Sequence, residues 1–135
     1  MFDFTHNSEL HNLIASVYER GAIVASVGHG YCGILNVRLS DGSYLVNGKI
    51  LTGPSWREEK LALVSQKVPY NAEELAKERG ADYIRWKRPY RGSAVATNGL
   101  VTGHNDSSSG NLVASSVCEE LAQLDLLKGK GSEPL

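Results

Sequence analysis

The spacing of apolar residues predicts a helix near the amino terminus, followed by a buried strand. Residues 8–20 carry apolar side chains at helical spacing, with Asn7 or Ser8 able to cap the start and Gly21 able to end the helix. Residues 22–27, AIVASV, form a continuous run of small and β-branched residues, which is typical of a strand buried on both faces of a parallel sheet. A helix followed by such a strand indicates an α/β fold.

Three further helices and one short strand are predicted along the chain. Asn71 can cap a helix, Glu74 lies three residues on in the capping-box position, and Gly80 can end that helix. ADYIRW has the composition of a short strand. By apolar spacing and capping signals, the helices are expected over residues 57–66, 71–79 and 107–127.

Two Asn-Gly pairs predict two small β-hairpins. Asn47-Gly48 and Asn98-Gly99 each lie between short runs suited to strands, and this dipeptide favours the two-residue turn of a hairpin. We find neither a repeat nor a linker. We therefore predict one domain over residues 1–128, followed by a disordered tail over 129–135.

Composition favours a soluble globular protein and argues against several partners. With 41% hydrophobic residues, a net charge of -1 and a pI near 6.4, the chain offers no electrostatic reason to expect nucleic acid or an anionic membrane. No apolar run approaches the roughly 20 residues of a membrane-spanning helix, and the start lacks a secretory pattern. We expect a cytoplasmic protein.

The cysteines and histidines do not predict a metal site. Cys32 and Cys118 fit neither a paired metal motif nor a disulfide framework, and the four histidines lack the spacing of metal ligands. We interpret Cys32 as a buried structural thiol and Cys118 as a packed or partly exposed one. No cofactor is expected.

One basic segment requires a separate interpretation. Residues 85–91, RWKRPYR, gather four cations around Trp86 and Tyr90, as a small platform for single-stranded nucleic acid does. Because no basic domain surrounds the segment, we interpret it as a solvated loop and expect no nucleic-acid partner.

The candidate chemistry lies at the turn Val27-Gly28-His29-Gly30. A buried strand, a tight glycine turn and a helix build a nucleophile elbow, in which the turn lifts a side chain out of the sheet and points backbone N–H groups at an oxyanion. His29 is therefore expected where the carboxyl end of a strand meets a helix, the usual position of α/β ligand sites. Gly30 belongs to the same turn, and we include it as a binding residue.

Several spaced motifs resemble the ThiJ/PfpI superfamily in its chaperone and glyoxalase III branch. The segment VGHGYCGILNVRLSDGSYLVNGKILTGPSWREE is similar to that branch's A-x-C-H-G-P elbow, LxDGxxLxxGKxxTG stretch and following glutamate. VPYNAEELAKERGADY and NGLVTGHNDSSSGNLVA also resemble this branch. The resemblance covers nearly the whole chain and implies a flavodoxin-like, three-layer, doubly wound sheet that lacks its first strands.

Residue by residue, the resemblance puts glycine at the position of the nucleophile. The family's cysteine falls on Gly28, its histidine on His29, and its glutamate on Glu59 or, as an alternative, Glu58. In the family the thiolate would attack a carbonyl while histidine polarises the thiol and the carboxylate orients the histidine. Gly28 has no side chain for this role.

Three functional hypotheses follow from the resemblance. The first is a degenerate, non-catalytic relative of glyoxalase III and of the stress chaperones. The second is an enzyme of glyoxalase III, deglycase or hydrolase type that acts on small methylglyoxal-like carbonyls without the thiol or with a partner. The third is a holdase-like chaperone. Because the missing strands would leave a strand unpaired, we expect a homo-oligomer or a partner chain that completes the sheet.

Overall fold

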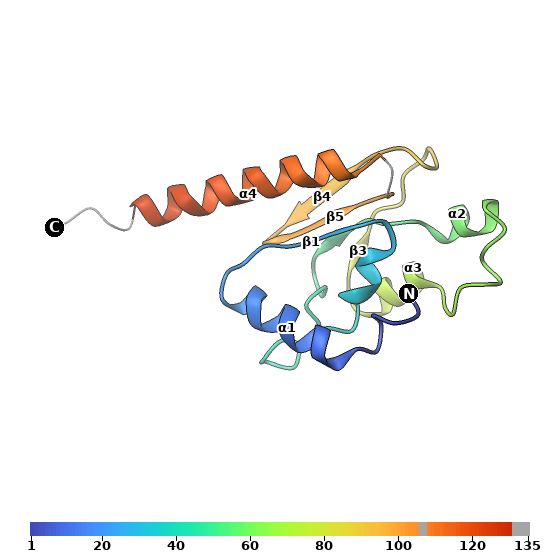
Figure 1. The fold of residues 1–135 in the computed structure, drawn as a ribbon, viewed down its shortest axis with the longest axis horizontal. Helices are drawn as coiled ribbons and strands as arrows, with labels where there is room; N and C mark the ends of the chain where they lie inside the picture. Colours follow the sequence, from blue (N-terminus) through green and yellow to red (C-terminus); the bar gives the residue numbers. More distant parts are fainter. Residues whose placement is uncertain (106–107, 131–135) are drawn as a thin grey trace.

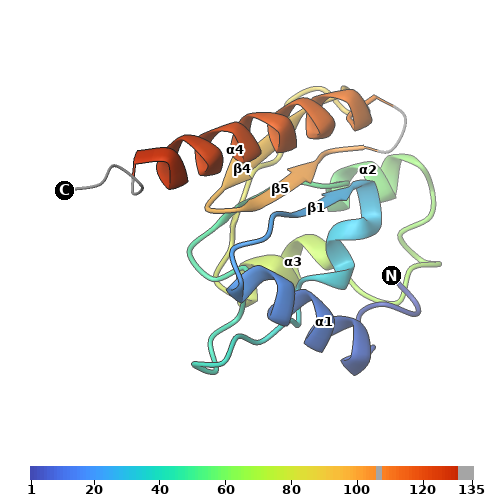
Figure 2. The same cartoon turned by 60° about the vertical axis from the view of Figure 1, so that its left-hand side comes forward.

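The protein is a mixed α/β molecule with helices on both sides of its main sheet. The computed structural model describes residues 1–105 and 108–130. The helix α4 (Gly110–Lys130) crosses one face of the main sheet, and α1 (Ser8–Glu19) and the short helix η1 (Gly28–Gly33) lie on the other side (Figures 1 and 2). The predicted α/β, layered architecture is confirmed.

The main sheet has the strand order β1-β5-β4. β1 (Val24–Val27) runs parallel to β5 (Leu100–Gly103), which pairs antiparallel with β4 (Ala94–Thr97). All four residues of the central strand β5 are buried. The prediction that the strand at 22–27 is buried on both faces is wrong, because Ala22 and Ala25 are exposed and only Val24 is buried. β1 is the edge strand of this sheet and pairs only with β5 among the described residues.

The second predicted hairpin is confirmed. β4 and β5 are joined by Asn98 and Gly99, which have φ values of 47° and 78°. Positive φ at both central residues is the requirement of the primed turn, which matches the twist of the two strands.

The first predicted hairpin is wrong. An isolated antiparallel bridge does join Arg38 to Tyr44, but the chain reverses there around Asp41-Gly42 and not at Asn47-Gly48. After Gly48, β2 (Ile50–Leu51) pairs in parallel with β3 (Asp82–Tyr83) in a separate two-stranded sheet. Gly48 N–H donates to the Gly80 carbonyl, so tertiary pairing directs the chain away from a hairpin at this point.

The predicted helices form with shifted ends. α1 is capped by Asn7, and α3 (Ala72–Glu78) is capped by Asn71, as expected. α2 (Trp56–Leu61) ends five residues early, where Leu63 adopts a left-handed backbone with φ 58°. α4 begins at Gly110 and continues through Lys130, two residues into the predicted tail, whose remaining residues lie outside the described ones.

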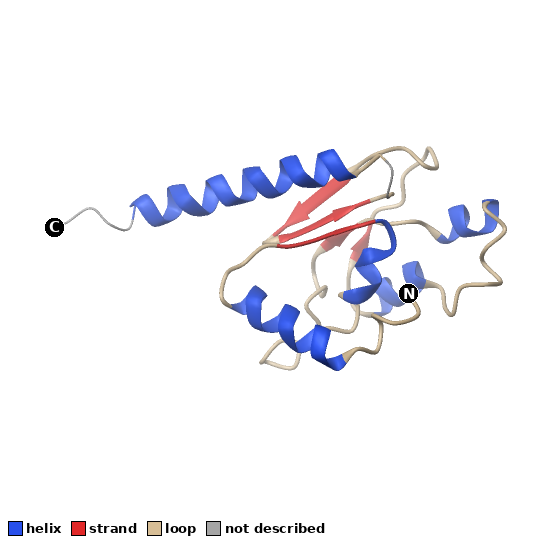
Figure 3. Cartoon of the chain, viewed as in Figure 1, coloured by secondary structure: helices blue, strands red, loops and turns tan. Residues whose placement is uncertain are grey.

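The core lies between the two sheets and the helices α1, η1 and α3. Tyr31 and Tyr83 meet there, with ring centroids 5.8 Å apart. Figure 3 shows α4 continuing beyond the ends of the strands that it covers. Accordingly only Val113 of α4 is buried, while several of its leucines are exposed: Leu112, Leu121, Leu126 and Leu127.

Close packing between β5 and α4 predicts the effect of a single methyl group. A Cβ at Gly103 would lie 2.6 Å from Val113 Cγ2 and 3.0 Å from Ser109 Cβ. Gly103→Ala is therefore expected to lower the free energy of unfolding by about 1–3 kcal/mol. In the control, Gly110→Ala, the new Cβ meets nothing within 4 Å, and we expect a change within about 0.5 kcal/mol. Urea denaturation measures both, and equal effects would refute the packing argument.

Candidate functional site

The predicted sharp turn is present at the carboxyl end of β1. Gly28 is buried and has φ 57°, in the left-handed region, and η1 begins at this residue. A residue with a side chain pays roughly 1–2 kcal/mol for this conformation, which glycine adopts without a steric penalty. The turn positions the next residue, His29, at the edge of the sheet.

His29 and Glu59 are brought together by this turn and by the first turn of α2. His29 Nε2 forms a hydrogen bond with Glu59 Oε1. The His29 side chain is 41% exposed, whereas Glu59 is 7% exposed, so the carboxylate is fixed inside the protein and the imidazole reaches solvent. The two residues that the resemblance predicted as histidine and carboxylate are therefore in direct contact.

Glu58, the alternative carboxylate, points elsewhere and is fully occupied. Its Oε2 accepts hydrogen bonds from the Ser55 N–H at 2.8 Å, the Ser55 hydroxyl at 2.9 Å and His104 Nε2 at 2.8 Å. Its Oε1 accepts from the Tyr90 N–H at 2.8 Å. Burial pushes the pKa of Glu58 upward, but the hydrogen bonds from Tyr90, His104 and Ser55 outweigh burial and hold that pKa below its usual value.

His104 completes this second histidine–carboxylate pair. It is buried, and its Nδ1 lies 2.9 Å from the Arg91 carbonyl oxygen while Nε2 faces Glu58. The two ring nitrogens therefore face a backbone carbonyl oxygen on one side and a carboxylate on the other. Sequence reasoning assigned no role to His104. The S-x-x-E capping box at Ser55 and Glu58 was the available signal that Glu58 caps the start of α2.

A cavity of about 300 Å³ opens beside His29. This volume is at the lower end of the range for small-molecule sites, roughly 300–1,000 Å³. Tyr90 forms part of its wall with a left-handed backbone, φ 59°, and Glu58 holds that backbone through the Tyr90 N–H. The cavity is lined by His29, Pro54, Glu58, Glu59, Ala62, Val64, Tyr90 and Asn105.

The two glycines of the predicted site support the turn and do not line this cavity. Gly30 is the third residue of η1, and a Cβ there would lie 3.3 Å from Ser26 Cβ. A direct role for Gly30 in binding stays a prediction.

The two cysteines differ in their exposure. Cys32 is completely buried, as predicted, and burial raises the pKa of its thiol, which disfavours the reactive thiolate. Cys118 is exposed on α4. Within residues 1–105 and 108–130, no group of three or more His, Cys, Asp or Glu side chains is arranged to hold a metal ion, and no helix is long and apolar enough to cross a membrane.

Comparison with known sequences identifies relatives that are named as glutathione-independent glyoxalases. No family model matches the chain. A Schizosaccharomyces pombe protein named "probable glutathione-independent glyoxalase" is 34% identical over 115 residues, which cover 80% of this chain and 44% of that protein. The glutathione-independent glyoxalase of Saccharomyces cerevisiae is 27% identical, over 87% of this chain and 52% of its own length. The chain thus spans about half the length of the curated relatives that it matches.

Solved structures show the same fold. The rapid encystment protein of Francisella tularensis superposes with a TM-score of 0.82 at 23% identity, over 89% of this chain and 52% of that one. Glyoxalase III of Candida albicans superposes with a TM-score of 0.78 at 24% identity, over 88% and 52% of the two chains. The sequence comparison confirms the predicted family resemblance, and the solved structures confirm the fold.

The lowered pKa of Glu58 predicts how stability depends on pH. Because the folded-state pKa lies below the unfolded one, the stabilisation is complete above the unfolded pKa and is lost as pH falls through the folded pKa. Glu58→Gln should cost about 2–3 kcal/mol at pH 7 and reduce the loss of unfolding free energy below about pH 5. Urea denaturation from pH 7 to pH 3 measures both. The exposed Glu78→Gln is the control, and equal pH slopes for the two variants would contradict the assignment.

Proposed function

We propose that this chain, a homologue of the glutathione-independent glyoxalases of the ThiJ/PfpI superfamily, is a binding protein for small carbonyl compounds that has lost thiol catalysis. The observation that carries the proposal is Gly28 at the turn where the resemblance expects the nucleophile. Beside it the remaining groups are preserved: His29 hydrogen-bonded to Glu59, at the edge of a cavity that suits a small ligand.

The argument from chemistry is that thiol catalysis needs a sulfur atom at the turn. A thiolate would add to the carbonyl carbon, and the neighbouring histidine would handle the proton released by the thiol. At position 28 there is no atom that can form the bond, and Cys32 is buried with a raised pKa. What remains is an imidazole whose second ring nitrogen can form a hydrogen bond with a bound ligand, and a carboxylate that orients the ring.

Turnover of methylglyoxal tests this function directly. We expect no lactate formation by the purified chain above the uncatalysed rate. Gly28→Cys should lower the free energy of unfolding by about 1–2 kcal/mol, because cysteine must adopt φ 57°. The variant should produce measurable turnover if the site is otherwise complete. The assay follows loss of the dicarbonyl and appearance of lactate.

Two variants separate the possible outcomes. Turnover by the unmodified chain that is abolished by His29→Ala would favour the thiol-independent enzyme and overturn the binding proposal. His11→Ala, at a half-buried histidine of α1 that does not line the cavity, is the matched control. If Gly28→Cys is folded by circular dichroism but inactive, the site lacks more than the thiol, which favours a partner-completed enzyme.

The free edge of β1 favours this second candidate, in which another polypeptide or a second copy completes the sheet. Val24 N–H donates to the Gly99 carbonyl, toward β5. Because N–H groups alternate along a strand, the Ala25 N–H faces the open edge. Unpaired strand edges are templates for pairing with another chain.

The exposed leucines of α4 support the third hypothesis, a holdase-like chaperone, because such a chaperone needs an exposed apolar surface.

Ala25→Pro tests edge pairing without breaking the β1–β5 ladder. Proline removes the N–H that faces the open edge and leaves that of Val24 in place. If copies of this chain pair through β1, light scattering should give a dimer mass for the unmodified protein and a monomer mass for the variant. A monomer for the unmodified protein at micromolar concentration would exclude self-pairing, and an unchanged dimer in Ala25→Pro would exclude this edge.

A further inference from the structure

The basic segment that sequence analysis interpreted as a solvated loop is anchored at many points. Trp86 Nε1 donates to Thr52 Oγ1 at 2.9 Å, and Arg85 Nε donates to Glu73 Oε1 at 3.1 Å. Further along, the Tyr90 N–H donates to Glu58, and the Ser93 N–H donates to Ser109 Oγ at 3.1 Å. These contacts hold the loop on either side of Lys87 and Arg88.

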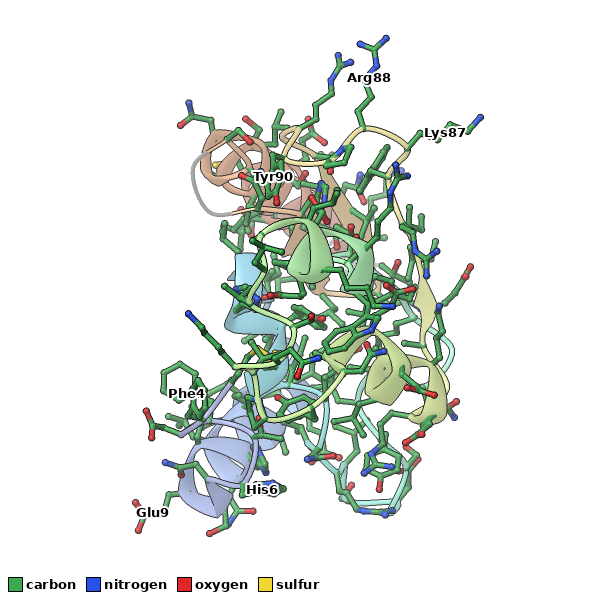
Figure 4. The ribbon with its side chains drawn as sticks, turned by 90° about the vertical axis from the view of Figure 1, so that its right-hand side faces the viewer. Phe4, His6, Glu9, Lys87, Arg88 and Tyr90 are labelled. Atoms are coloured by element: carbon green, nitrogen blue, oxygen red, sulfur yellow. The ribbon has the colours of Figure 1, made fainter. Side chains whose placement is uncertain are left out.

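Three cations of this loop have no protein partner within the described residues. Arg85 is neutralised by the buried Glu73, but the charged side chains of Lys87, Arg88 and Arg91 form no ion pair or hydrogen bond with residues 1–105 or 108–130. Figure 4 shows Lys87 and Arg88 extending from the loop at the same end of the molecule. In sequence, no acidic residue occurs between Asp82 and Asp106, although the whole chain has a net charge of -1.

These cations surround a cavity that also contains an aromatic surface. The cavity has a volume of about 590 Å³ and is lined by Ile84, Arg85, Trp86, Lys87, Arg88, Arg91, Gly92 and Ser93. Trp86 is 37% exposed, and its hydrogen bond to Thr52 fixes the orientation of the indole. Gly92, which also lines the cavity, packs so closely on the Ser108 backbone that no side chain fits there.

We propose that the cavity formed by residues 84–93 binds a nucleoside phosphate, with the base on Trp86 and the phosphates on Lys87, Arg88 and Arg91. Bases stack on tryptophan irrespective of sequence, and arginine matches phosphate through paired donors. A volume of this size accommodates a ligand with a ring and a short phosphate chain. The site is separate from the His29 cavity, so the proposal does not depend on the function assigned above.

The intrinsic fluorescence of Trp86 provides the assay. Trp56 and Trp86 are the two tryptophans of the chain, so Trp56→Phe leaves Trp86 as the reporter. ADP is expected to change its emission in a saturable way. Pyrophosphate lacks the base and adenosine lacks the phosphates, so each should bind at least about tenfold more weakly than ADP. Lys87→Ala and Arg88→Ala should each raise the Kd for ADP about tenfold, because each removes a charge-assisted contact.

The control is Lys67→Ala, which removes an exposed lysine outside the cavity and should leave the Kd unchanged. Equal weakening by Lys67→Ala would show non-specific charge attraction and overturn the proposal, as would the absence of saturable binding. Binding of pyrophosphate as tight as that of ADP would remove the role of Trp86. A single-stranded oligonucleotide that binds far more tightly than ADP would replace a nucleotide site with a nucleic-acid site.

Discussion

The buried carboxylate of Glu58 is the interaction on which the candidate site depends. Through four hydrogen bonds it joins the start of α2, the loop at Tyr90 and the residue that follows β5, His104. An ionised carboxylate is stable inside a protein only when such donors surround it. Removing any one donor leaves charge uncompensated, so these three parts of the chain must keep their relative positions.

That fixed arrangement explains why the neighbouring residue can serve as part of the ligand site. Successive residues of a helix point in directions about 100° apart, since a turn holds 3.6 residues. Glu58 turns inward to hold the framework, and Glu59 is directed toward His29. One short helix therefore supplies a structural carboxylate and a site carboxylate from adjacent positions, and the first fixes the placement of the second.

Local signals predicted the elements well and failed where distant segments decide the geometry. Asn98-Gly99 forms a hairpin because both residues adopt positive φ between strands that pair with each other. At Asn47-Gly48 only the glycine has positive φ, and Gly48 pairs with Gly80, which no neighbouring residue encodes. The family resemblance predicted His29 and Glu59 as site residues. No sequence pattern predicted the contact between His104 and Glu58, which lie 46 positions apart in the chain.

The glycine at the elbow also alters the energetic balance of the site. A nucleophile at this turn must adopt a left-handed backbone, so its presence stores strain of roughly 1–2 kcal/mol that the surrounding structure has to offset. Gly28 adopts this conformation without that cost, whereas Glu58 holds the left-handed backbone of Tyr90 in place through the Tyr90 N–H. Under the proposed loss of the thiol, the turn itself therefore carries no steric penalty. Retention of the architecture is therefore weak evidence for retained catalysis, and the function must be argued from the atoms at the site.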